Sequence, residues 1–385
     1  MKEVRIGIIG IGNMGSSHAE RIVNGEIEGL HLAAVADLKE ERRKWAGKNL
    51  PEYVRIYENE TRLMEDSDLD AVLIAAPHYA HPTIAQAAFR KGLHVVCEKP
   101  AGVYTKQVRE MNEEAEKHKE LVFAMMFNQR TNPVYRKMHE MVSDGRYGEI
   151  KRVNWIITDW YRTQYYYDSG GWRATWDGEG GGVLLNQCPH NLDLLQWICG
   201  MPSSVYAFCH EGKWHQIEVE DDVTAYLEYP NGATGVFVTS TGDAPGTNRF
   251  EIDLEMAKLV SEDGRLNVYE LKENEREYCF RVKESFTKPQ GCLTQIKPEE
   301  EGNQHNRILQ AFTDAVRNGS QLIAGGEEGI LGLTLSNAMH LSSWLKRPVN
   351  IPFDEELFLD ELNKRRRTSQ KKRNVHEVTS DLKGS

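Results

Sequence analysis

The stretch VRIGIIGIGNMG, residues 4–15, decides the fold. Its first half is a continuous apolar, β-branched run, which is typical of a strand buried on both faces in a parallel sheet. Three glycines, Gly10, Gly12 and Gly15, follow with the spacing G-x-G-x-x-G and lead into a helical pattern. Gly10 permits a tight turn, Gly12 lets the backbone approach a pyrophosphate, and Gly15 lets the helix pack close to the strand. The stretch therefore predicts a dinucleotide site, with the phosphates at the helix N-terminus.

Asp37 ends the next predicted strand, about 20 residues further on, where a carboxylate accepts from the ribose hydroxyls of the dinucleotide. Because a carboxylate repels the 2′-phosphate of NADP, the sequence favours NAD over NADP. Two alternatives stay open. Asp37 could instead cap the helix that follows it, and Arg42 and Arg43 could serve a 2′-phosphate.

The rest of the chain extends this pattern. Further apolar runs alternate with amphipathic helix patterns up to residue 128, which predicts a doubly wound parallel sheet. Beyond residue 130 the strands become longer and alternate in polarity, and YPNGAT (229–234) predicts a hairpin turn. We therefore predict three parts: an NAD(P)-binding Rossmann domain over residues 1–127, an α+β domain with a large open, mostly antiparallel sheet for substrate binding and oligomerisation over 128–360, and a charged C-terminal extension over 361–385.

Composition excludes several classes of protein. The net charge of −11 argues against a general nucleic-acid binder, although the basic residues of the C-terminal extension keep that role conceivable for the tail. No apolar run reaches membrane-spanning length, and the N-terminal run is too short for a signal peptide. Six scattered cysteines signal neither a disulfide framework nor a zinc site, and no group of residues has metal-ligand spacing. We expect a cytoplasmic enzyme without a metal, a membrane or a nucleic acid as partner.

Two further motifs carry chemistry. HVVCEKPAG (94–102) places Lys99 at the carboxyl end of a buried strand, the edge at which open α/β sheets bind ligands. There a lysine stabilises a developing alkoxide, or alternatively pairs with Glu98 at the surface. GGGVLLNQCPHNLDLLQW (180–197) gathers polar side chains where a helix begins, among them His190. Imidazole suits acid–base catalysis near neutral pH, although a lone histidine is more often a buried structural one.

These motifs, together with APHYAHPTIAQAAFRKGLHVVCEKP (76–100), resemble the Gfo/Idh/MocA oxidoreductase family over roughly residues 3–353. The resemblance implies NAD(P)-linked oxidation of a sugar or polyol carbinol, with a C-terminal sheet that often makes oligomer contacts. It implies that Lys99 serves catalysis and substrate orientation, that His190 is the acid/base, and that His81 shapes the cofactor loop. His18 is expected to be structural. With the resemblance included, the cofactor site is assigned to Gly10, Gly12, Asn13, Met14, Gly15, Asp37, Ala76, Pro77, His81, Glu98 and Lys99.

One position departs from the family pattern. Asn186 stands four residues before His190, where the family usually has aspartate. An aspartate raises the pKa of a neighbouring histidine by its charge, whereas an asparagine only forms hydrogen bonds. We therefore expect Asn186 to position a substrate hydroxyl, with Gln187 as a second amide contact. Electrostatic assistance to His190 must then come from elsewhere. Asp193 either orients the imidazole or favours the helix dipole, and Cys188 is expected to pack.

TDWYRTQYYYDSGGWRATWDGEGGG (158–182) is dense in aromatic residues and arginines, which stack on sugar rings and grip carboxylates or phosphates. An oligomer interface is the alternative explanation for this composition. Asn128 and Arg130 are further candidates at the domain junction. Stacking faces could come from Trp160, Tyr161, Tyr165, Trp172 and Trp176, and the substrate site as a whole is assigned to Lys99, Tyr161, Arg162, Trp172, Arg173, Asn186 and His190.

The sequence thus predicts an NAD-dependent sugar or polyol dehydrogenase, a homodimer or homotetramer, with His190 as acid/base and Lys99 stabilising the reacting oxygen. Two alternatives remain. One is an enzyme that recycles tightly bound NAD during epimerisation or glycosidic cleavage. The other is a dinucleotide-binding sensor without catalysis.

Overall fold

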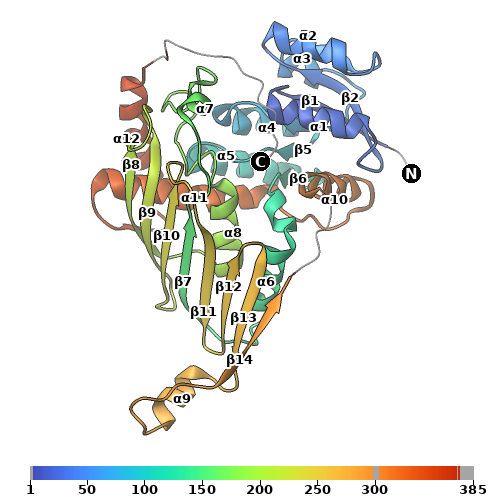
Figure 1. Cartoon of the computed structure of the whole chain (residues 1–385). Coiled ribbons are helices and arrows are strands. Elements are labelled where there is room, and N and C mark those ends of the chain that lie inside the picture. The colour runs from blue at the N-terminus through green and yellow to red at the C-terminus, as the bar shows by residue number, and fades with distance from the viewer. Residues whose placement is uncertain (1–2, 298–302, 371, 373–385) are drawn as a thin grey trace.

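The computed structural model describes residues 3–297, 303–370 and 372, and it contains two sheets that lie side by side (Figure 1). The first sheet has six strands in the order β3-β2-β1-β4-β5-β6, all parallel. This confirms the doubly wound parallel sheet. Its strands are β1 (Val4–Ile9), β2 (Leu30–Ala36), β3 (Arg55–Tyr57), β4 (Ala71–Ile74), β5 (His94–Cys97) and β6 (Phe123–Met125).

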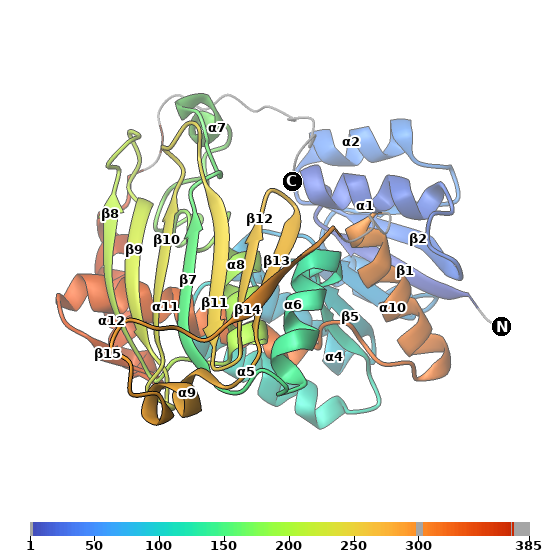
Figure 2. The same cartoon turned by 60° about the horizontal axis from the view of Figure 1, so that its bottom comes forward.

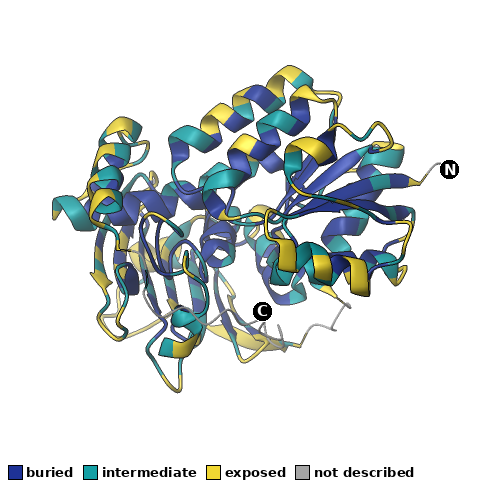
Figure 3. Cartoon of the chain, turned by 90° about the horizontal axis from the view of Figure 1, so that it is seen from above, coloured by how far each residue is buried: buried dark blue, intermediate teal, exposed yellow. Residues whose placement is uncertain are grey.

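Helices cover both faces of this sheet, and their inner sides are buried while their outer sides are exposed (Figure 3). They are α1 (Asn13–Val23), α2 (Glu40–Asn49), α3 (Glu60–Met64), α4 (His81–Arg90) and α5 (Thr105–Ala115), with short 3₁₀ turns η1 (His78–Ala80), η2 (Glu116–His118) and η3 (Asn128–Thr131).

Helix α10 (Gln304–Asn318) returns from far along the chain to the first sheet (Figure 2). Its apolar side, formed by Ile308, Leu309 and Phe312, shares one core with residues on one face of β1 and β2, among them Ile6 and Leu32. The core of the first sheet therefore includes a helix that lies within the predicted second domain. A boundary drawn along the sequence alone misses such a return.

The second sheet has nine strands in the order β14-β13-β12-β11-β7-β10-β9-β8-β15. Only β7 and β10 are parallel, which confirms a large, mostly antiparallel sheet. The predicted hairpin is also confirmed, since β9 and β10 pair across a turn in which Tyr229 N donates to Ala233 O at 2.9 Å. The strands are β7 (Ile150–Ile157), β8 (Ser204–Glu211), β9 (Glu220–Glu228), β10 (Thr234–Ser240), β11 (Asn248–Leu254), β12 (Ala257–Glu262), β13 (Arg265–Leu271), β14 (Gly291–Ile296) and β15 (Val349–Asn350).

One face of the second sheet is covered by helices. Helix α11 (Gly329–Leu345) packs against β8, and α8 (Pro189–Cys199) contacts both α11 and α6 (Pro133–Ser143) (Figures 1 and 2). The remaining elements are α7 (Gln164–Asp168), α9 (Glu275–Arg281), η4 (Gly326–Glu328) and α12 (Glu355–Thr368). No helix in the described residues is long and apolar enough to cross a membrane.

The predicted start of a C-terminal extension at residue 361 falls inside α12. Leu362 of this helix is fully buried, and the guanidinium of Arg365 lies 3.9 Å from the ring centroid of Trp344. The last turns of α12 therefore pack on the body of the protein, since Arg365 reaches Trp344 of α11 and Arg366 lies 4.8 Å from the ring centroid of Tyr79. The rest of the extension, residue 371 and residues 373–385, lies outside the described residues.

Candidate active site

The glycine loop joins β1 to α1, and a glycine stands at each of its three positions for a different reason. Gly10 has φ +92°, and a Cβ there would lie 2.6 Å from Ala75 O. A Cβ at Gly15 would lie 1.9 Å from Gly10 O, so both glycines are required by close backbone contacts. A Cβ at Gly12 would meet nothing within 4 Å. Gly12 is also the N-cap of α1 and offers no capping side chain, so this helix end suits an incoming phosphate.

Asp37, at the end of β2, holds this loop. Its Oδ2 accepts from Ile11 N at 2.7 Å and its Oδ1 accepts from Lys39 N at 2.9 Å. Asp37 does not cap α2, which was the alternative. The N-cap of that helix is Lys39, and the helix has no hydrogen bond from a capping side chain. Arg43 donates to the carbonyls of Asp37 and Leu38 at 2.7 and 2.8 Å. The guanidinium of Arg43 is thus partly committed to the backbone.

Glu98 is buried beneath the lysine rather than paired with its ammonium group. Its Oε1 lies 2.7 Å from His18 Nε2, and its Oε2 accepts from Lys99 N at 3.2 Å. His305 of α10 meets the ring of His18 edge-on at 5.7 Å. Burial raises the pKa of Glu98, but the hydrogen bond and charge of His18, together with His305 and Lys99, bring that pKa to about 2. His18 is buried and bonded to Glu98, and His305 was not identified from sequence.

Lys99 follows β5 of the first sheet, and His190 lies at the start of α8, which packs with the second sheet; the two are near enough for the charge of Lys99 to act on His190. Lys99 Nζ donates to the backbone oxygen of Asn186 at 3.2 Å, which ties the E-K-P loop to the segment before α8. Burial lowers the pKa of Lys99, and Glu98 opposes that shift. Burial lowers the pKa of His190 well below its usual value, and the charge of Lys99 adds to the shift.

His190 lies in the first turn of α8 and is half-buried. Its Nδ1 is enclosed and has no hydrogen-bond partner among the described residues. Nε2 is the nitrogen left for a ligand. A neutral imidazole with one accessible nitrogen can accept a proton from a hydroxyl.

The loop after β4, which carries Ala76 and Pro77, is held by two histidines. His81 bridges two backbone oxygens, with Nε2 2.6 Å from Ala76 O and Nδ1 2.8 Å from Pro100 O. Both nitrogens of His81 are therefore used to shape the loop. His78, which sequence reasoning did not single out, lies with Nδ1 3.2 Å from Glu179 O. That contact joins the first unit to the segment 158–182.

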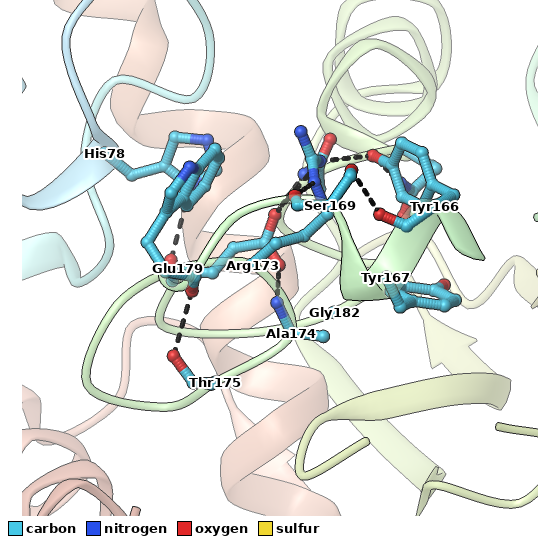
Figure 4. Close-up of polar contacts among 12 residues, drawn as sticks. His78, Tyr166, Tyr167, Ser169, Arg173, Ala174, Thr175, Glu179 and Gly182 are labelled. Carbon is cyan, nitrogen blue, oxygen red and sulfur yellow. Dashed lines mark hydrogen bonds and ion pairs between the residues drawn. The ribbon is translucent and has the colours of Figure 1, made fainter. Parts of the chain in front are cut away.

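Glu179 is a buried carboxylate that sequence reasoning also missed (Figure 4). It accepts from the side-chain Nδ2 of Asn186, and its Oε2 accepts from Ala174 N at 2.5 Å. The guanidinium of Arg173 lies 3.9 Å from its Oε1. Burial raises the pKa of Glu179, while Arg173 and these two hydrogen bonds oppose the shift. In the sequence Glu179 stands beside three glycines and resembles an ordinary loop residue, so no local pattern indicates that it is buried.

Aromatic and cationic side chains of 158–182 gather around Tyr166. Arg173 donates to its hydroxyl at 2.5 Å and stacks on its ring at 4.3 Å (Figure 4). Gln187 donates to the same hydroxyl at 3.1 Å, and the guanidinium of Arg162 lies 5.2 Å from the ring centroid. Trp172 is the second ring under Arg173, at 4.9 Å. The structure thus brings together Arg162, Trp172 and Arg173, with Tyr166 at the centre.

Tyr161 is not part of this cluster. Its side chain is 49% exposed, and Tyr165 is 57% exposed. Trp176 is buried and packs edge-on against Trp344 at 5.6 Å, and Trp160 donates to Asn191 at 3.2 Å. Both tryptophans are thus engaged with the protein interior.

Packing explains three residues of the stretch 180–193: Gly182, Asp193 and Cys188. A Cβ at Gly182 would lie 1.9 Å from Glu220 O, so the close approach of this loop to β9 requires a glycine there. Asp193 neither orients the imidazole of His190 nor lies where its charge would interact with the dipole of α8. It forms two bonds of 2.7 and 2.8 Å with Arg130, and both side chains are buried. Arg130 therefore joins η3 to α8. Cys188 does pack, with Sγ 3.1 Å from Thr239 Oγ1.

The C-terminal residues reach the same region. Ser369 Oγ donates to Glu218 Oε2 at 2.6 Å, and the guanidinium of Arg366 lies 3.1 Å from Asp177. Lys372 Nζ donates to the backbone oxygen of Tyr167. The end of α12 and the residues after it therefore brace the segment that carries Trp172 and Arg173. No group of three or more His, Cys, Asp or Glu side chains within the described residues is arranged to hold a metal ion.

Comparison with known proteins agrees with this geometry. Residues 4–126 match a family model described as "Oxidoreductase family, NAD-binding Rossmann fold", and residues 135–260 match the "GFO/IDH/MocA C-terminal domain". The myo-inositol 2-dehydrogenase of Thermotoga maritima is 25% identical over 358 residues, which span 90% of this chain and 98% of that protein. The levoglucosan dehydrogenase of Pseudarthrobacter phenanthrenivorans is 26% identical over 283 residues, 65% of this chain and 70% of that protein.

Solved structures show the same fold. The WlbA dehydrogenase from Bordetella pertussis, in complex with NADH and UDP-GlcNAcA, aligns with a TM-score of 0.75 at 22% identity, covering 92% of this chain and 100% of that chain. A levoglucosan dehydrogenase in complex with NADH and L-sorbose aligns with a TM-score of 0.75 at 19% identity, again covering 92% and 100%.

Proposed function

The chain belongs to the Gfo/Idh/MocA family of oxidoreductases with an NAD-binding Rossmann fold, and from that premise we propose that it oxidises a secondary alcohol of a sugar or cyclic polyol, with His190 as acid/base and Lys99 on the reacting oxygen. The observation that carries the proposal is the hydrogen bond from Lys99 Nζ to Asn186 O, which brings the end of β5 to the start of α8. The lysine and the histidine thereby share the edge of the sheet at which the glycine loop lies.

His190 and Lys99 have complementary tasks in this proposal. The neutral imidazole of His190 accepts the proton of the substrate hydroxyl at Nε2. The ammonium group of Lys99 stabilises the negative charge that develops on the same oxygen, an effect that its partly buried position strengthens. When bound, NAD supplies the hydride acceptor.

The same residues support NAD as the cofactor. The open side of Gly12 at the N-terminus of α1 suits the pyrophosphate, and the carboxylate of Asp37 suits ribose hydroxyls and opposes a 2′-phosphate. Asn13, Met14, Ala76 and Pro77 belong to the loops at this edge. His81 and Glu98 are proposed to act indirectly, because their polar atoms are already bonded within the protein.

The substrate side is proposed to consist of Arg162, Trp172, Arg173 and Asn186 together with Lys99 and His190. Trp172 and the arginines around Tyr166 offer ring faces and donors for a polyhydroxylated ring. Tyr161, the remaining residue assigned to the substrate from sequence, is 49% exposed and makes the weakest candidate. The relatives named as myo-inositol and levoglucosan dehydrogenases support a cyclic polyol or sugar as the substrate class.

The outer face of the second sheet supports a homo-oligomer. Two rows of facing residues cross β7, β10, β9 and β8: Ile156, Val238, Thr224 and Phe208, and beside them Asn154, Val236, Tyr226 and Tyr206. Ile156, Phe208 and Tyr226 are 41%, 53% and 43% exposed. A second copy of this chain that covers the patch would bury it.

The function is tested by following NADH formation with NAD⁺ across a panel of inositols, aldoses, amino sugars and uronic acids. Turnover of one class that is lost in both His190→Ala and Lys99→Ala would support the proposal. NAD binding without turnover on any compound would overturn it and favour a sensor. Turnover that persists in both variants would overturn the assignment of the two residues.

A further inference from the structure

Glu179 is a buried carboxylate one hydrogen bond from the proposed site, and the reaction described above does not use it. It comes from the loop before "GGG", it is 1% exposed, and it faces the side chain of Asn186. The backbone oxygen of Asn186 accepts from Lys99 Nζ, and His190 lies four residues further on. A single residue, Asn186, thus connects the buried charge to the lysine.

The carboxylate determines how the amide of Asn186 is turned. Oε2 of Glu179 is bonded to Ala174 N at 2.5 Å, and Oε1 receives Nδ2 of Asn186. An ionised carboxylate only accepts hydrogen bonds, so the amide must present its NH₂ group to Glu179. Its oxygen Oδ1 then points the other way, and no described residue donates to that oxygen. Arg173, 3.9 Å from Glu179, favours the ionised form.

We infer that Glu179 is a positioning residue: it holds the Asn186 amide so that Oδ1 accepts a hydrogen bond from the substrate. The substrate group recognised there is a hydrogen-bond donor, namely a hydroxyl next to the reacting carbon. A substrate with a carbonyl or ether at that place binds less well, because neither group can donate to Oδ1. This inference rests on the proposed function for its substrate, although the Glu179–Asn186 pairing itself does not.

Exchanging the two side chains tests this assignment. In Glu179→Gln, the bond from Ala174 N holds the glutamine oxygen and turns its NH₂ toward Asn186, whose amide must then reverse. We expect kcat/KM to fall by about 10- to 100-fold, the loss typical of an unsatisfied buried polar group. Asn186→Asp alone sets two carboxylates against each other and should lose a similar factor.

In the double variant Glu179→Gln/Asn186→Asp, the glutamine NH₂ donates to one aspartate oxygen and the other oxygen again faces the substrate. We expect kcat/KM at least roughly tenfold above the product of the two single effects. Glu114→Gln is the control, because Glu114 is another carboxylate with little exposed surface, 7% against 1% for Glu179, and it pairs instead with the exposed side chains of Arg90 and Lys117. It should change stability without changing kcat/KM.

Additive losses in the double variant, or an unchanged Glu179→Gln, would overturn the inference. Thermal midpoints of the same four proteins, wild type included, give a readout that needs no substrate. Restoration of the midpoint in the double variant supports the pairing even if the wild type turns over none of the sugars, in which case the proposed function fails separately. Two independent decreases in the midpoint would refute the pairing itself.

Discussion

The surroundings of His190 and Lys99 lower the pKa of both side chains. Burial and the charge of Lys99 lower the pKa of His190, and burial lowers the pKa of Lys99 despite the opposing charge of Glu98. Alcohol oxidation in the proposed mechanism needs the imidazole neutral and the ammonium charged. Both conditions hold between the two lowered pKa values, so the structure creates a window that is shifted toward acid relative to the free side chains.

This window predicts the pH profile of kcat/KM for NAD⁺-dependent oxidation. The acid limb should lie below pH 6.5, the usual pKa of histidine, and the alkaline limb below 10.5, the usual pKa of lysine. In Lys99→Arg the charge persists to higher pH, so the alkaline limb should move upward while the acid limb remains. An alkaline limb that is identical in the variant would assign it to another group.

The lowered pKa of Glu98 should make the free energy of unfolding depend on pH. Its pKa is about 2 in the folded protein against a usual value of 4.5, because His18, His305 and Lys99 outweigh burial. A lowered acid pKa stabilises the fold above pH 4.5, and that contribution is lost as the pH falls toward 2. The shift corresponds to at most roughly 3 kcal/mol.

Urea unfolding of the wild type and Glu98→Gln at several pH values measures this contribution. The difference in free energy of unfolding should be constant at neutral pH and should shrink below pH 4.5. A difference that does not depend on pH would mean that Glu98 is not held ionised by its neighbours.

At the scale of elements, the junction between β1 and α1 contains glycines required by close backbone contacts, Gly10 and Gly15, and one proposed to contact the cofactor, Gly12. Gly15→Ala places a Cβ 1.9 Å from Gly10 O, whereas Gly12→Ala places one in open space. We expect Gly15→Ala to lower the thermal midpoint or prevent folding. Gly12→Ala should keep the midpoint of the wild type and weaken NAD binding, by about tenfold if the methyl group displaces the pyrophosphate by one hydrogen bond. Calorimetric titration with NAD⁺ compares the two. Unchanged affinity in Gly12→Ala would place the phosphates elsewhere.

Arg130 of η3 and Asp193 of α8 form a buried ion pair, so the effects on stability of substitutions at these two residues should depend strongly on one another. Arg130 binds Asp193 at 2.7 and 2.8 Å and also Glu328 at 2.7 Å. Arg130→Met should cost about 3–5 kcal/mol, because it leaves the Asp193 charge buried without its partner. Arg130→Met/Asp193→Leu should recover most of that loss in denaturant unfolding. Equal losses in both variants would show that the pair only fills space.

At the scale of the whole molecule, the proposed site depends on both units, since Lys99 comes from the first and His190 from the second. The outer face of the second sheet is left apolar over β7–β10, on the side away from α8 and α11. We expect a dimer or tetramer by light scattering. Tyr226→Glu, in the middle of the patch, should reduce the mass toward that of one chain, whereas Glu228→Gln, on the same face of β9, should not. An unchanged mass for Tyr226→Glu would locate the interface elsewhere.

Much of this molecule was determined by local sequence. The apolar run before Gly10 specifies a parallel strand, the glycine spacing specifies the turn, and the alternation beyond residue 130 specifies the second sheet. Each of these follows from the period of a single strand or from the φ of a single glycine. Lys99 and His190 stand in short motifs at a strand end and a helix start, and their roles were assigned from the resemblance of these motifs to the Gfo/Idh/MocA family.

Only the tertiary structure decided which buried groups face one another. His305 reaches His18 because α10 returns to the first sheet, Asp193 meets Arg130 rather than His190, and Glu179 faces Asn186 across a loop. Ser369 and Gln370 bind the carboxylate of Glu218, and Lys372 binds the backbone oxygen of Tyr167, although the composition of this segment resembles a solvated tail. Contacts between segments far apart in the chain leave no periodic trace in sequence. They arise because a buried charge must find a partner wherever the packing of the core provides one.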